Sequence, residues 1–118
     1  MAGLAAFPKC YLDDIIVRKS MTLLDWIEQA AALGVDGLEM HHLFFDGASQ
    51  AFVEEVIACA HDHNLSMPMM CFSPDFTQPD LQDRLAELEK QKRAIDLTAQ
   101  LGGRFCRATG RIETGGLD

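Results

Sequence analysis

The sequence of 118 residues has few of the features that mark nucleic-acid-binding or membrane proteins. It contains no cluster of lysine and arginine, and its net charge of -8 is opposite in sign to the charge that binds a phosphate backbone. An acidic surface also disfavours contact with anionic membranes. No apolar run approaches the roughly 18 residues of a membrane span. We therefore expect no nucleic-acid partner and no membrane partner.

Signals for export and for disulfide bonding are also lacking. The N-terminus has neither the basic segment nor the long apolar segment of a secretory signal. The four cysteines lie far apart, form no CxxC pair and each sit in an apolar stretch; they are Cys10, Cys59, Cys71 and Cys106. Buried free thiols are typical of the reducing cytoplasm. The sequence therefore predicts a cytoplasmic protein without a disulfide framework or a cysteine zinc site.

What is present is an alternation of strand and helix signals. Strands are expected at residues 4–11, 34–42, 65–72 and 104–109. Helices are expected from residue 20 or 22 to 33, from 49 to 63 and from 81 to 101. The helix stops at Gly34, Asn64 and Gly102 suit a left-handed backbone and repeat every 30 to 38 residues. Such a βα repeat indicates a parallel sheet with right-handed crossovers.

The sequence also predicts helix caps, loops, the core face of the last helix and the bounds of the domain. Ser20 or Thr22 caps the first helix and Asp80 caps the last. Segments 12–19 and 44–49 are expected to be loops. The last helix is expected to place five side chains in the core, namely Leu81, Leu85, Leu88, Ile95 and Leu97. Residues 1–110 form one domain, and the Gly-rich segment 111–118 is assigned no structure.

The predicted fold class is α/β, with about four parallel strands and three helices. Two architectures share this pattern, an open doubly wound sheet and a partial (β/α)8 TIM barrel. A full barrel needs about 250 residues, so a chain of 118 residues supplies about half of one.

The segment Gly34–His42 carries the most informative polar residues. Strand side chains alternate between faces, so Glu39 and His41 share one face near the end of the strand, where parallel α/β folds bind ligands. A carboxylate and an imidazole in this position can bind substrate hydroxyls. Alternatively, Glu39 forms a structural ion pair with Lys9 or Arg107 from neighbouring strands.

Two further groups follow the later strands. Ser73 and Asp75 lie in the loop after the third strand, where barrels carry specificity, although Ser-Pro-Asp is also ordinary turn chemistry. Arg107 and Thr109 end the fourth strand. Arginine suits phosphate or carboxylate recognition, and the alternative is that Arg107 balances the charge of Glu39. We therefore predict a substrate-binding set of Glu39, His41, Arg107, Lys9, Ser73 and Asp75.

The sequence resembles a known family at these same positions. Ala-Ala-Leu-Gly followed by Val-Asp-Gly-Leu-Glu-Met-His, at residues 31–41, is similar to the second βα junction of xylose isomerase-like barrels. The order continues with His-Asp-His-Asn-Leu, Cys-Phe-Ser-Pro-Asp-Phe and Gln-Leu-Gly-Gly-Arg-Phe-Cys-Arg. The resemblance covers residues 4 to about 109 of the N-terminal half of such a barrel. This superfamily includes sugar phosphate isomerases and epimerases, and endonuclease IV-type enzymes.

The resemblance implies a sugar or sugar-phosphate isomerase or epimerase that uses metal-assisted proton transfer. In that family the Mn or Mg ligands and the catalytic bases come from later strands, so no catalytic or metal residue is assigned here. We expect this chain alone to bind no cofactor and to be inactive. One alternative is a non-enzymatic half-barrel that binds a small ligand or forms a homo-oligomer through its exposed sheet edges. Another is an endonuclease IV-like zinc phosphodiesterase, whose histidines after strands three and four are missing here.

Overall fold

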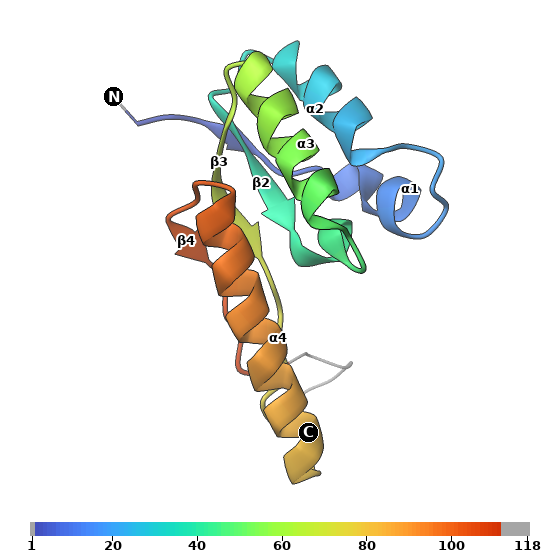
Figure 1. Ribbon diagram of the computed structural model, residues 1–118, viewed down its shortest axis with the longest axis vertical. Coiled ribbons are helices and arrows are strands. Elements are labelled where there is room, and N and C mark those ends of the chain that lie inside the picture. The colour runs from blue at the N-terminus through green and yellow to red at the C-terminus, as the bar shows by residue number, and fades with distance from the viewer. Residues whose placement is uncertain (1, 112–118) are drawn as a thin grey trace.

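A computed structural model describes residues 2–111 and contains one sheet of four parallel strands in the order β1-β2-β3-β4 (Figure 1). The strands are β1 (Ala5–Ala6), β2 (Gly37–His41), β3 (Ser66–Cys71) and β4 (Phe105–Cys106). This arrangement confirms the predicted α/β class and the partial barrel. The predicted unstructured tail lies almost entirely outside the described residues.

Four α-helices connect the strands, namely α1 (Leu12–Ile16), α2 (Leu23–Ala31), α3 (Gln50–Asp62) and α4 (Leu81–Gln100). Figure 1 shows α2 and α3 side by side, whereas α4 lies along β3 and β4 and extends well past the ends of these strands. No helix within residues 2–111 has the length and hydropathy needed to cross a membrane.

The segment after β1 differs from the prediction. The first strand has two residues instead of eight, because the chain turns at Pro8, which offers no N–H to a sheet ladder. A 3-10 helix at Lys9–Tyr11 and then α1 follow, where a strand end and a loop were expected. A second 3-10 helix, His42–Phe45, begins the segment after β2.

The helix ends follow the local signals in the sequence. The hydroxyl of Thr22 accepts a hydrogen bond from the Asp25 N–H at 3.0 Å, and the Asp25 carboxylate accepts one from the Thr22 N–H at 2.9 Å. This reciprocal pair is a capping box. Asn64 adopts a φ of 55°, so the predicted left-handed helix stop is confirmed. Asp80 caps α4 as expected, through a hydrogen bond from the Gln82 N–H at 2.7 Å.

The expected core face of α4 is wrong. Leu81, Leu85, Leu88 and Ile95 are 41–56% exposed, and Leu97 is half-buried. The helix instead buries three smaller or polar side chains against the sheet, which are Gln91, Ala94 and Thr98. The Thr98 hydroxyl donates a hydrogen bond to the Ala94 carbonyl at 2.6 Å, so this buried polar group has a partner. The leucine stripe therefore lies on a different face of the helix.

The core lies between the sheet and the helices. Leu38 and Met40 of β2 are fully buried there, so Glu39 and His41 lie on the opposite face. Between β2 and β3 the register slips by one residue, because Gly37 pairs with Ser66 whereas Glu39 pairs with Met69. Because of this bulge, the side chains of β3 change the order in which they alternate between the two faces of the sheet.

Candidate functional site

The candidate site lies at the carboxyl ends of β2, β3 and β4, on the sheet face that α2 and α3 do not cover. Strand pairing aligns Glu39 with Met69 and His41 with Cys71 across β2 and β3. Paired residues of neighbouring strands point to the same face, so these four side chains border one surface. In a complete barrel this surface is the lumen near its mouth.

His41 is held in one orientation and one protonation state. Its Nδ1 accepts a hydrogen bond from the Leu43 N–H at 3.1 Å, so the neutral ring carries its proton on Nε2. Burial is the main cause that lowers the pKa of His41 to about 4, and the nearby charges of His42, Arg107 and Lys9 contribute to the same shift. The ring is therefore neutral at pH 7 and offers Nε2–H as a donor.

Arg107 joins the loops that follow β3 and β4. Its Nη2 donates to the Ser73 hydroxyl at 2.6 Å, and its Nε donates to the Phe72 carbonyl at 3.3 Å. The Thr109 hydroxyl donates to the Pro74 carbonyl at 3.0 Å. The structure thus brings together two predicted site residues, Arg107 and Ser73, and leaves further N–H groups of the guanidinium available.

Glu39 does not form the ion pair that was considered as an alternative. It is half-buried, and within residues 2–111 it makes no salt bridge with Lys9 or Arg107. The alternative of a direct ion pair between Glu39 and Lys9 or Arg107 is therefore wrong. Lys9 lies exposed on the 3-10 helix after β1, and its charge still reaches His41.

Asp75 has a local structural role. Its carboxylate accepts hydrogen bonds from the Thr77 N–H at 2.9 Å and from the Thr77 hydroxyl at 2.6 Å. These bonds lower the pKa of Asp75. Its own N–H donates to Glu87 of α4 at 3.1 Å. The side chain therefore closes a turn and does not join Arg107 and Ser73.

Cys71 is a site residue that the sequence analysis missed. It was interpreted only as one of four buried thiols, and the β2–β3 register is what places it beside His41. Burial raises the pKa of its thiol, Arg107 lowers it and Glu39 raises it. All four cysteines are free, but only Cys71 is buried; Cys59 and Cys106 are half-buried and Cys10 is exposed, so the expectation that each is buried is wrong for these three.

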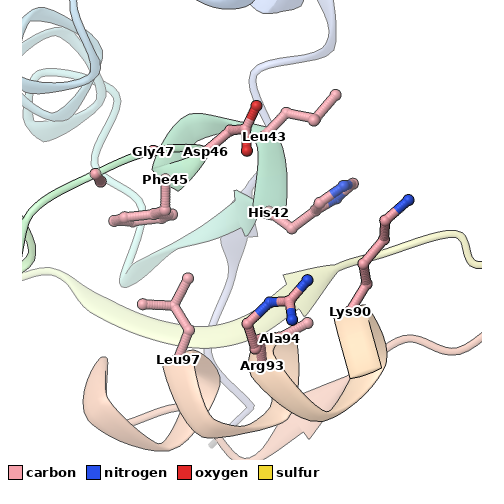
Figure 2. A pocket seen from close by; sticks show the side chains of 10 residues that line it. His42, Leu43, Phe45, Asp46, Gly47, Lys90, Arg93, Ala94 and Leu97 are labelled. Carbon is pink, nitrogen blue, oxygen red and sulfur yellow. The ribbon is translucent and has the colours of Figure 1, made fainter. Parts of the chain in front are cut away.

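A cavity of about 540 Å³ lies elsewhere, between the 3-10 helix after β2 and α4. Figure 2 shows His42, Lys90 and Arg93 around it. Burial lowers the pKa of His42, and its hydrogen bond with the Cys71 backbone opposes this. Lys90 is already paired with Glu87 at 2.8 Å. Because its cations are partly neutralised and Glu39 and Arg107 do not line it, the strand ends remain the better candidate site.

Among residues 2–111 no group of three or more His, Cys, Asp or Glu side chains could hold a metal ion. The residues that the structure describes therefore do not fit the divalent metal that the resemblance implies.

Solved structures with this fold include several sugar epimerases. D-psicose 3-epimerase from Clostridium cellulolyticum, solved with D-tagatose, has a TM-score of 0.74 at 18% identity, over 91% of this chain and 37% of its own. A 3-keto-D-glucoside 4-epimerase from E. coli has a TM-score of 0.58 at 21% identity, over 70% of this chain and 31% of its own.

A probable 3-DHS dehydratase from Bacillus anthracis has a TM-score of 0.71 at 14% identity, over 91% of this chain and 38% of its own. This chain thus spans 31–38% of the length of these proteins, and the likeness shows a shared fold. No curated protein matches the sequence. A family model described as "Xylose isomerase-like TIM barrel" matches residues 27–116. Since the match extends over most of the sequence, the chain belongs to the xylose isomerase-like TIM barrel family.

Proposed function

We propose that this chain is the sugar-binding N-terminal part of an isomerase or epimerase barrel. The observation that carries the proposal is the meeting of Glu39, His41 and the Arg107–Ser73 pair on one face, at the carboxyl ends of three adjacent strands. Structures of the same fold support a sugar as ligand, because D-psicose 3-epimerase was solved with D-fructose and with D-tagatose.

Each of these residues has a distinct proposed role. The Nε2–H of His41 donates to a sugar hydroxyl, and neutrality of the ring avoids the cost of desolvating a cation. The Glu39 carboxylate accepts from hydroxyl groups, with a charge-assisted bond. Arg107 uses its remaining N–H groups for a hydroxyl or a phosphate, while Ser73 holds the guanidinium in place. Lys9 adds a positive field at the mouth.

The proposal divides the reaction between two parts of a complete barrel. This chain binds and orients the sugar, and its described side chains offer no metal site. Any Mn or Mg, and the bases that move the proton next to the carbonyl, would be held by residues outside the described part of this chain. We therefore propose that the isolated chain binds sugar without turnover. The same lack of ligands gives no support to the zinc phosphodiesterase alternative.

Binding can be tested on the chain alone by titrating isotope-labelled protein with D-fructose and with D-fructose 6-phosphate in NMR spectra. We expect the amide shifts to centre on Glu39, His41, Ser73 and Arg107. Glu39→Gln should weaken binding about tenfold, because a hydrogen bond to a charged group contributes roughly 1.5–3 kcal/mol. Glu28→Gln, at an exposed position of α2, is the matched control and should not change affinity. Shifts confined to the cavity beside α4, or equal effects of both variants, would contradict the proposal.

A further inference from the structure

The cavity beside α4 has no role in the proposed sugar binding. Its volume of about 540 Å³ is in the range of small-molecule sites. None of the residues proposed to bind sugar lines it, because its walls are residues 42–48 on one side and α4 on the other. The cavity therefore offers a second place where a small molecule could bind.

Both walls of the cavity belong to successive βα units. Residues 42–48 lead from β2 towards α3, and α4 leads from β3 to β4. β2 and β3 are neighbours in the sheet. Further strands of a barrel would join at the sheet edges, β1 and β4, so they would leave this cavity in place.

One end of the cavity is apolar. Phe45 and Ala94 are buried and Leu97 is half-buried. Figure 2 shows Phe45 and Leu97 at one end of the cavity, from opposite walls, and His42 and Lys90 at the other end. The apolar part of a ligand would be removed from water between Phe45 and Leu97, which favours binding.

Arg93 places a cation at the opening of the cavity. Its guanidinium extends from α4 towards the segment after β2 (Figure 2). Lys90 is paired with Glu87 at 2.8 Å, whereas Arg93 forms no salt bridge within residues 2–111. Glu89 lies one turn before Arg93 and is paired with Lys92 at 2.8 Å. The guanidinium of Arg93 is therefore available to an anion.

His42 contributes a polar atom that has no partner in the described part of the chain. The ring lines the cavity, and its buried Nδ1 makes no hydrogen bond within residues 2–111. Buried polar atoms without a partner are uncommon in native proteins because each costs free energy. The ring also stacks on His41, with the ring centroids 4.8 Å apart. His42 therefore lies between the cavity and the candidate sugar site.

We propose that this cavity binds a small monocarboxylate with an apolar body. The carboxylate pairs with Arg93, whose planar fork suits two parallel hydrogen bonds, and the apolar body lies between Phe45 and Leu97. Asp46 also lines the cavity, and its negative charge disfavours a dianion such as phosphate. The site is separate from the proposed sugar site and does not depend on it.

Titration of isotope-labelled protein with phenylacetate in NMR spectra tests the proposal. We expect saturable shifts of the amides of Phe45, Ala94 and Leu97. Arg93→Gln should weaken binding about fivefold, since a partly exposed ion pair contributes on that scale. Arg104→Gln makes the same chemical change at an exposed arginine outside the cavity and should not change affinity. Both positions are exposed, and circular dichroism should show that both variants fold.

Two further ligands test the chemistry of the site. Phenylacetamide keeps the ring of phenylacetate without its charge, and inorganic phosphate has the charge without an apolar body. Both should bind more weakly than phenylacetate. Equal or tighter binding of either one would overturn the proposal, as would equal effects of Arg93→Gln and Arg104→Gln or a lack of saturable shifts at the cavity.

The two binding proposals can fail separately. Glu39→Gln should leave the affinity for phenylacetate unchanged, and Arg93→Gln should leave the affinity for D-fructose unchanged. If Glu39→Gln weakens phenylacetate binding as much as Arg93→Gln does, the monocarboxylate binds at the strand ends, and the assignment of this cavity is overturned.

Discussion

Protonation of His41 should make the stability of this chain depend on pH. The folded state holds the pKa of His41 at about 4, whereas the unfolded chain has the ordinary value of 6.5. Below pH 6.5 the unfolded chain therefore binds a proton that the folded chain does not. The free energy of unfolding should fall as the pH is lowered from about 6.5 to about 4, and the contribution of His41 should be constant above and below that window.

The expected loss in the free energy of unfolding depends on how deeply the His41 ring is buried. At full value, a pKa lowered from 6.5 to about 4 corresponds to about 3.4 kcal/mol. The ring is only half-buried, so screening by solvent reduces the expected loss to roughly 1.5 kcal/mol. Urea unfolding at pH 7.5 and at pH 4.5 measures it, and NMR titration of the ring protons measures the pKa directly.

The control is His41→Gln, which keeps a polar side chain but does not titrate. The variant should lose about 1 kcal/mol or more of the pH dependence and keep the part that comes from His42, whose pKa is also lowered by burial. If the original chain and His41→Gln have the same pH dependence, or if the His41 ring titrates near 6.5, the argument that burial keeps this ring neutral is refuted.

Two further predictions concern stability. Thr22→Ala should lower the free energy of unfolding by about 1 kcal/mol because α2 loses its capping box with Asp25, while Thr22→Ser should lose much less; urea unfolding compares them. Gly37→Ala should cost roughly 1–3 kcal/mol, because the added Cβ would lie 2.5 Å from Oγ and 2.8 Å from the carbonyl oxygen of Ser66. Gly110→Ala, where no atom lies within 4 Å of the new Cβ, should be nearly neutral in the same assay.

Local signals in the sequence predicted the helix ends well, and longer-range packing explains the errors. A capping hydroxyl at Thr22 or a left-handed stop at Asn64 depends on a few neighbouring residues, so the sequence contains the whole cause. The face of α4 that packs in the core, in contrast, does not depend on neighbouring residues alone. This helix carries one stripe of large apolar side chains and one face of small and polar side chains, and periodicity favours the apolar stripe although the sheet meets the other face. The choice of Ala94 over Leu88 follows from how closely α4 approaches β3 and β4.

For the candidate site, too, the sequence predicted features within one strand and did not predict contacts between strands. Strand alternation correctly placed Glu39 and His41 on the face opposite Leu38. The partner of Arg107 was not predictable, because a hydrogen bond to Ser73 instead of a salt bridge depends on the relative heights of two strand ends. The β2–β3 register that brings Cys71 to His41 is likewise a property of the folded sheet.

The bulge between Gly37 and Glu39 changes which alternate side chains of β3 face the core at its two ends. Met67 lies in the core below the bulge and Met70 lies in the core above it, three residues apart, so the strand changes phase between them. Replacements above the bulge alter the mouth without changing which side chains fill the base.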